Sequence, residues 1–231
     1  YGCENTVLLF HDTKTEPKDN DRFRAEVAAY IGLPITEDSD GRDIWQVFED
    51  EGYLGNGRNT MCSRLLKQER SMAYILRNHK PNLFHAAEDA ILHIGFTPDE
   101  WQRAQRVTAR YALACITVKF PLMEHNISKA ECRHRVENCW GIRPPEMYAW
   151  ADHANCVPCV KGKKAYWGLV YKFERKAWER ASAAEKKFGC TIFTEAGSLE
   201  EELENCLRLA DKYLLKREGE TLYDAPCECA V

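Results

Sequence analysis

Short apolar runs alternate with amphipathic stretches along the first two thirds of the chain. Residues 7–10, 91–94 and 116–120 are apolar and have the length of buried parallel strands, and residues 33–36 indicate a further short strand. Each run is followed by a segment with helical spacing. The alternation predicts an α/β fold with a mostly parallel central sheet flanked by helices.

Helix boundaries are marked by capping residues. Asp43 and the pairs Thr97/Glu100 and Ser128/Glu131 have the chemistry of helix starts, while Gly32 and Gly52 are typical helix ends. The final third shows only helical spacing, so we expect an α/β domain over residues 1–160 and a helical region with a cysteine-containing tail over 161–231. The segments with helical spacing are residues 19–32, 43–52, 63–77, 97–111, 128–140, 161–187 and 198–217.

Composition narrows the class of protein. Hydrophobic residues make up 45% of the 231 residues, which is enough for a packed core, and the net charge of -4 argues against nucleic-acid binding over the whole surface. No apolar run is long enough to span a membrane, and the first residues do not have the pattern of a signal peptide. We therefore expect a cytoplasmic protein that does not bind membranes.

The number of cysteines is unusual for such a protein. The chain has 11 of them, an odd number, and clustered cysteines in a cytosolic protein indicate metal ligands or redox thiols more than structural disulfides. Cys115 and Cys206 lie among apolar or helical neighbours and are expected to be small buried side chains.

The strongest local signal is the Cys-x-x-Cys pair formed by Cys156 and Cys159, which is followed by Lys161. Such a pair holds a metal or cluster, acts as a redox dithiol, or arises by chance spacing. A tetrathiolate site needs two more cysteines, and spacing does not decide between zinc and an iron–sulfur cluster. The candidates for these further ligands are Cys62, Cys132, Cys139, Cys227 and Cys229.

Five segments occur in one order: HDTKTEP at 11–17, CSRLLK at 62–67, PLME at 121–124, GIRPPEMY at 141–148 and HANCVPCVKG at 153–162. Together they resemble the phosphoadenosine-phosphosulfate reductase-like proteins of phages and mobile elements, a branch of the adenine-nucleotide α-hydrolase (ATP pyrophosphatase) superfamily. The resemblance covers about residues 5–170. The superfamily's Ser-Gly-Gly-x-Asp/Thr-Ser pyrophosphate loop does not occur in these 231 residues, and the chain's first ten residues resemble the approach to the family's second strand.

The resemblance implies an adenine nucleotide, ATP or an adenylyl sulfate, at the carboxyl edge of the sheet. It also implies a 4Fe–4S cluster, with zinc as the alternative. Cys62, Cys156 and Cys159 match ligand segments of the relatives, and Cys132 is our choice for the fourth ligand because phage-type relatives are similar there. The tail at Cys229 is faintly similar to the ending that carries the reductase nucleophile.

Other residues of these segments are candidates for nucleotide binding. Asp12 and Thr13 follow a strand, where the carboxylate contacts ribose or a metal, or simply forms a turn. Arg64 and Lys67 can hold phosphate or sulfate or belong to a solvated helix face. His153, with Lys161, can position an anion or be a structural histidine.

Two classes of function follow. The first is an enzyme of adenine-nucleotide-dependent sulfur chemistry, which either reduces an adenylyl sulfate with a thioredoxin-like partner or thiolates a nucleic acid after adenylation. The second is a non-enzymatic module, stabilised by a cluster or zinc, within a nucleic-acid-associated assembly.

Overall fold

The computed structural model describes residues 2–81, 90–154 and 156–219. The fold is α/β with 56% helix, which confirms the predicted class. Two compact units make up the chain. Unit 1 combines Tyr1–Leu66 with Pro145–Ala230, and unit 2 is the intervening stretch Lys67–Pro144.

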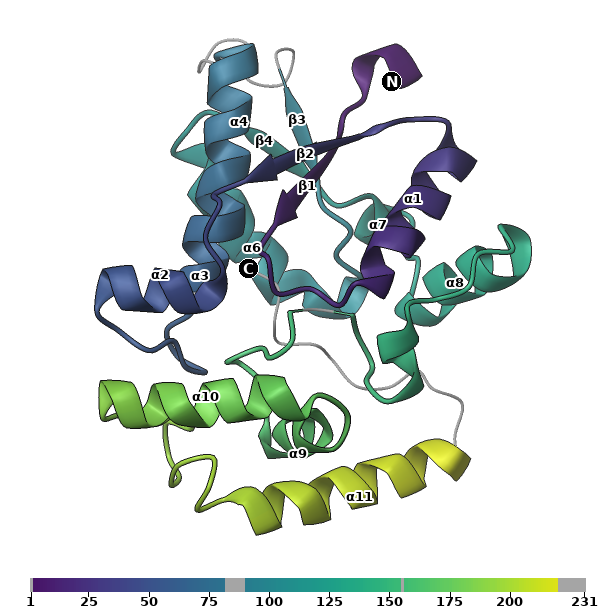
Figure 1. Ribbon diagram of the computed structural model, residues 1–231. Coiled ribbons are helices and arrows are strands. Elements are labelled where there is room, and N and C mark those ends of the chain that lie inside the picture. The colour runs from purple at the N-terminus through teal and green to yellow at the C-terminus, as the bar shows by residue number, and fades with distance from the viewer. Residues whose placement is uncertain (1, 82–89, 155, 220–231) are drawn as a thin grey trace. The chain divides into compact units, whose positions relative to one another are not determined.

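A two-stranded parallel sheet forms the amino-terminal part of unit 1. Strand β1 (Leu8–Asp12) pairs with β2 (Ile35–Ser39), and the helix α1 (Asp19–Ile31) connects them, as Figure 1 shows. Both strands end at the same edge, with Asp12 opposite Ser39. The loops that follow the two strands therefore start side by side, which is where ligands bind in parallel α/β sheets.

Three helices from the carboxyl-terminal third pack together in unit 1 (Figure 1). They are α9 (Lys164–Phe173), α10 (Arg175–Phe188) and α11 (Leu203–Gly219). Their apolar faces share one core with α2, which includes the fully buried Trp167, Phe48 and Leu199. The remaining elements of this unit are η1 (Cys3–Asn5), α2 (Ile44–Glu51), α3 (Met61–Ser63) and η5 (Glu146–Ala149).

Unit 2 has its own sheet and its own core. Strand β3 (Ile91–His93) pairs in parallel with β4 (Thr117–Lys119), and the core includes Val107 and Phe96. The π-helical segment η2 (Arg64–Gln68) spans the boundary between the units. The other elements are α4 (Glu69–His79), η3 (Pro98–Glu100), α6 (Trp101–Ala112), α7 (Pro121–Glu124), α8 (Lys129–His134) and η4 (Arg135–Cys139).

The predicted strands are parallel, but within the described residues they form two separate pairs, so one central sheet is not seen. β1 also lies further along the chain than the apolar run indicated, since it includes the polar residues His11 and Asp12. The reason is pairing: His11 lies opposite Asp38 of β2, and its Nδ1 lies 3.1 Å from the Asp38 carboxylate. Local apolarity could not reveal this cross-strand pair.

The predicted caps are confirmed. Asp43 forms a capping box with Gln46, Thr97 forms one with Glu100, and the Ser128 side chain accepts a hydrogen bond from the Glu131 N–H. The helix expected over 161–187 is wrong in one respect, because it is divided at Glu174 into α9 and α10.

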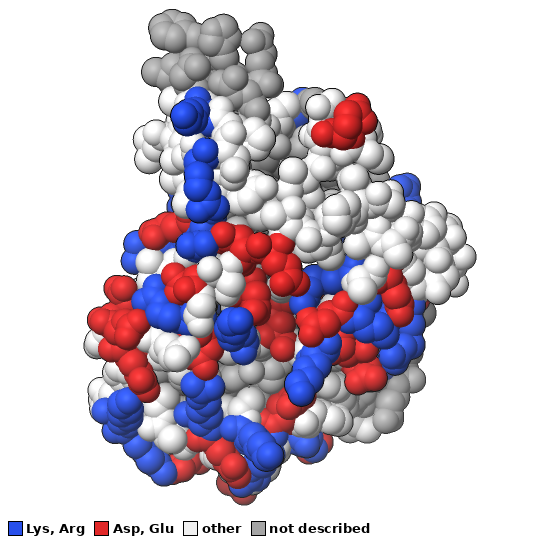
Figure 2. All heavy atoms as spheres, turned by 45° about the horizontal axis from the view of Figure 1, so that its top comes forward, with Lys and Arg blue, Asp and Glu red and all other residues white. Residues whose placement is uncertain are grey.

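Charged side chains of both signs are interspersed on the face shown in Figure 2. Ion pairs within the described residues include Lys187 with Glu49 at 2.7 Å and Lys186 with Glu200 at 2.6 Å. Among the described residues, no helix is both long and apolar enough to cross a membrane.

Candidate functional site

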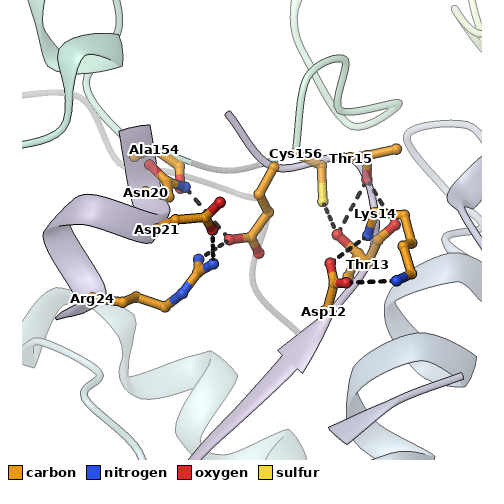
Figure 3. Close-up of polar contacts among 10 residues, drawn as sticks. Asp12, Thr13, Lys14, Thr15, Asn20, Asp21, Arg24, Ala154 and Cys156 are labelled. Atoms are coloured by element: carbon orange, nitrogen blue, oxygen red, sulfur yellow. Dashed lines mark hydrogen bonds and ion pairs between the residues drawn. The ribbon is translucent and has the colours of Figure 1, made fainter. Parts of the chain in front are cut away.

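The carboxyl end of β1 meets the Cys-x-x-Cys loop within unit 1. The Thr13 hydroxyl lies 3.2 Å from the Cys156 sulfur, although the two residues are 143 positions apart in the sequence. Figure 3 shows the sulfur directed toward Thr13 and Thr15. The two threonine hydroxyls lie 3.1 Å apart, and Thr13 is only 1% exposed, so the sulfur contacts a small buried polar cluster.

Two further hydrogen bonds hold the cysteine loop against the segment after β1. The Val157 N–H donates to the carbonyl of Thr15 at 2.8 Å, and the Asn20 side-chain amide donates to the carbonyl of Ala154 at 3.2 Å. Asn20 is buried, and its own Oδ1 is also buried without a hydrogen-bond partner among the described residues. This asparagine therefore carries an acceptor that a bound donor could satisfy.

The turn after β1 has a constrained backbone. Lys14 has a φ of 59°, in the left-handed region that side chains other than glycine rarely adopt. Asp12 stabilises this turn, because its carboxylate accepts the Lys14 N–H at 2.8 Å and lies 3.1 Å from the Lys14 ammonium. Partial burial would raise the pKa of Asp12, but these interactions, with a contribution from Arg24, outweigh it and lower the pKa below its ordinary value. Asp12 is thus an anion that stabilises the turn at the end of β1.

The start of α1 is fixed by a network around Arg24. Its guanidinium donates to Glu16 at 3.1 Å and pairs with Asp21 (Figure 3). It also lies over the Phe10 ring, 3.6 Å from the centroid. These contacts connect β1, the following turn and the helix. The segment that contacts the cysteine loop is consequently anchored at both ends.

The Tyr166 hydroxyl closes the Cys-x-x-Cys turn from the side of α9. It donates to the carbonyl of Cys156 at 3.1 Å and accepts the N–H of Cys159 at 3.0 Å. Gly162 makes room for this arrangement, because a Cβ there would lie 2.1 Å from the Tyr166 ring. A small residue at position 162 and a hydroxyl at 166 therefore set the spacing of the two cysteines.

His153 packs its ring against Tyr166, with the ring centroids 5.9 Å apart. Its Nδ1 is buried and has no hydrogen-bond partner within the parts of the chain that the structure describes. The histidine predicted to position an anion therefore lies beside the cysteine turn. Lys161 follows the turn directly and is partly buried.

The predicted cluster ligands are only partly brought together. Cys62 and Cys159 pack at the margin of the same apolar core, whereas Cys156 contacts Thr13. Cys132 lies on α8 in unit 2. Burial raises the pKa of its thiol; the charge of Arg135 lowers this pKa and the charge of Glu131 raises it. Over residues 2–81, 90–154 and 156–219, no group of at least three Cys, His, Asp or Glu side chains is arranged to hold a metal ion. Because Cys132 belongs to a different unit from the other three cysteines, the four-cysteine cluster stays a prediction, and we derive no chemical step through one.

The two basic residues predicted to hold an anion lie on one π-helical segment. Arg64 is exposed on η2 in unit 1, while Lys67, on the same π-helical segment, belongs to unit 2. Cys229, the predicted nucleophile, and Cys227 lie outside the described residues. Cys206 is buried as predicted, and burial raises the pKa of its thiol to about 11. The same prediction for Cys115 is wrong, because Cys115 is partly exposed.

Sequence reasoning missed the residues that organise this site. Tyr166 and Asn20 form key contacts of the cysteine loop, yet neither belongs to a recognisable motif spacing. Thr15 lies within segment 11–17, but the sequence pattern indicates only Asp12 and Thr13 as candidates. The one available signal was the Lys161-Gly162 pair, since a glycine beside a functional turn often reflects close packing.

Comparison with known proteins gives no relative: no protein-family model, no curated protein and no solved structure matches the chain.

Proposed function

We propose that unit 1 binds an adenine nucleotide at the carboxyl end of β1 and uses the adjacent cysteine thiols in sulfur chemistry. The contact between the Thr13 hydroxyl and the Cys156 sulfur supports the proposal most directly. It joins 11–17 and 153–162, two of the five segments on which the resemblance to phosphoadenosine-phosphosulfate reductase-like proteins depends.

Several polar groups around this contact are suited to a nucleotide. The Asn20 Oδ1 and His153 Nδ1 are buried without partners among the described residues, so a ligand bearing both donors and acceptors would satisfy them. Thr13 presents a buried hydroxyl, and Arg64 supplies a cation in the same unit. In this proposal the nucleotide lies along the loop after β1, and its anionic groups are held by Arg64.

The chemistry divides into two reactions that share this site. In a reductase-like reaction, a thiol attacks the sulfur of an adenylyl sulfate and the adenosine phosphate leaves; a thiol reductant then releases sulfite from the resulting thiosulfonate as a disulfide forms. In a thiolation reaction, a nucleic-acid group is adenylated by ATP with release of pyrophosphate, and a sulfur donor then displaces AMP. The observed proximity of thiols to the strand end supports both, and their products distinguish them. The 4Fe–4S cluster implied by the resemblance stays a prediction, which anaerobic purification followed by iron and sulfide assays would test.

Calorimetric titration of the chain with ATP, adenylyl sulfate and phosphoadenylyl sulfate tests the proposal. We expect one of them to bind and Arg64→Ala to weaken that binding about 10-fold or more, which is the loss of a charge-assisted hydrogen bond. Arg175→Ala is the matched control, because Arg175 is exposed on α10 and pairs with Glu179 at 3.0 Å. Absence of binding to all three ligands, or equal weakening by both variants, would contradict the proposal.

A further inference from the structure

We propose that Cys156 and Cys159 form a reversible dithiol–disulfide couple whose geometry is set by Thr13 and Tyr166. The inference goes beyond the proposed function, since it requires neither a nucleotide nor a metal. It concerns the electron-transfer capacity of the loop itself.

The backbone of the turn is held by one side chain. The Tyr166 hydroxyl contacts the Cys156 carbonyl at 3.1 Å and the Cys159 N–H at 3.0 Å. The carbonyl oxygen of Cys156 and the backbone nitrogen of Cys159 are therefore at most about 6 Å apart. The Cys159 carbonyl in turn accepts the Gly162 N–H at 2.9 Å. The two cysteines are thus held on a short, closed stretch of chain, which limits how far apart their Cα atoms can move, as an intramolecular disulfide requires.

The two sulfurs have different surroundings. The Cys156 sulfur contacts the Thr13 hydroxyl at 3.2 Å, whereas Cys159 packs against the apolar core of unit 1. Asymmetry of this kind is typical of dithiol pairs in which one sulfur exchanges with an external disulfide and the other completes the internal bond. Because Thr13 is buried and held by Thr15, its hydroxyl is a fixed partner for one sulfur only.

Both cysteines are partly exposed, so a small reagent can reach them. One thiol attacks a sulfur of a low-molecular-weight disulfide and releases one reduced thiol, leaving a mixed disulfide on the protein. The second cysteine then attacks the protein sulfur of the mixed disulfide, forming the Cys156–Cys159 bond and releasing the second thiol. Two electrons pass from the cysteine pair to the external disulfide, and the two cysteine protons end on its thiol products.

The test equilibrates the full chain anaerobically in buffers of varied glutathione to glutathione disulfide ratio. After acid quenching and alkylation, mass spectrometry of the peptide containing both cysteines reports its state. We expect an internal disulfide, lacking both thiol hydrogens, to replace the dithiol as the ratio falls. Cys156→Ser and Cys159→Ser should each abolish it, while the matched control Cys190→Ser, at an exposed position of the same unit, should leave it unchanged.

Two further variants, Thr13→Val and Tyr166→Phe, test whether the contacts around the cysteine pair affect its oxidation. Each should shift the glutathione ratio at half-oxidation by roughly 3-fold or more, because each removes a contact of the pair but no sulfur. Persistence of both thiols at every ratio, or glutathione adducts without an internal disulfide, would overturn the proposal in the wild-type chain even if the variants fail to fold. Nucleotide titration is a separate measurement, so failure of the proposed function would not be mistaken for failure of this one.

Discussion

Gly168 of α9 lies directly against the backbone of Cys206 on α11. A Cβ at position 168 would come within 2.1 Å of the Cys206 carbonyl oxygen and 2.8 Å of the Ala210 Cβ. The obstructing atom is backbone, so a side-chain rotation cannot relieve the overlap. The close approach of the two helices therefore depends on the absence of a side chain at this position.

Gly168→Ala should destabilise unit 1 by about 1–3 kcal/mol, the usual cost of overpacking, despite the roughly 1 kcal/mol gain in helix propensity. Urea unfolding followed by tryptophan fluorescence would measure the change in unfolding free energy. Gly189→Ala is not a suitable control because Gly189 has a φ of 63°. Ala184→Gly on α10 removes a methyl group instead of adding one, and a loss as large as that of Gly168→Ala would not support the steric explanation.

Tyr166→Phe should destabilise the cysteine turn, because it leaves the Cys159 N–H and the Cys156 carbonyl without their shared partner. We expect a loss of about 1–3 kcal/mol in unfolding free energy. Tyr53→Phe is the matched control, since it removes a hydroxyl that accepts a hydrogen bond from Asn56 at an exposed position. Its effect should stay within about 0.5 kcal/mol. Equal effects of the two variants would mean that the Tyr166 hydroxyl contributes little to the turn.

Glu185 gives unit 1 a pH-dependent contribution to stability. Its buried carboxylate accepts the N–H groups of Ile192 and Leu199, both at 2.7 Å. Burial raises the pKa of Glu185 above its ordinary value of 4.5; the two N–H groups oppose this rise, and nearby acidic side chains add to it. Because the pKa is higher in the folded state, the contribution is fully present below about pH 4.5 and is lost as the pH rises through the folded-state pKa.

Glu185→Gln removes this titration and retains one acceptor oxygen. As the pH rises above 4.5, the wild type should therefore lose stability relative to the variant, measured as unfolding free energy. Urea unfolding of both proteins at a series of pH values measures this difference and cancels the groups they share. A difference that is constant with pH, or that shifts toward the wild type, would contradict the assigned direction.

Arg217, near the end of α11, holds the loop that precedes the cysteine turn. Its guanidinium donates to the Tyr148 carbonyl at 2.6 Å and to Asp152 at 3.1 Å, with side-chain exposures of 11% and 14% for Arg217 and Asp152. Arg217→Met should cost about 3 kcal/mol, because it leaves the mostly buried Asp152 carboxylate without its cation. The double variant Arg217→Met/Asp152→Asn should recover part of that loss in urea unfolding. Strict additivity of the two changes would show that the pair is not coupled.

Local chemistry explains why the helix boundaries could be predicted from sequence. Asp43 caps α2 with a side chain that accepts two backbone N–H groups within three residues, and Gly32 and Gly52 end their helices in the left-handed conformation. Such signals require only neighbours along the chain. The division at Glu174 carries no proline or glycine signal, and nothing in the structure explains it.

Non-local contacts explain what could not be predicted. β1 extends to Asp12 because β2 pairs with it, and β2 lies more than twenty residues further along the chain. The meeting of Thr13 with Cys156 could not be predicted, since no spacing rule connects residues 143 positions apart. Tyr166 became identifiable as part of the site only when its hydroxyl could be placed between the two cysteines.

The composition of unit 1 from two separate stretches of sequence has a consequence for biosynthesis. The contacts of Thr13 and Thr15 with the cysteine loop cannot form until the chain has been extended past residue 157, and by then all of Lys67–Pro144 has been made. Lys67–Pro144 is one continuous stretch, so it can begin to fold on the ribosome while the segment after β1 still lacks its contacts with the cysteine loop. Long-range closure of unit 1 is the slower event, because contacts between distant residues carry a larger loop entropy. During synthesis, the cysteine loop therefore lacks its contacts with Thr13 and Thr15 until that closure occurs.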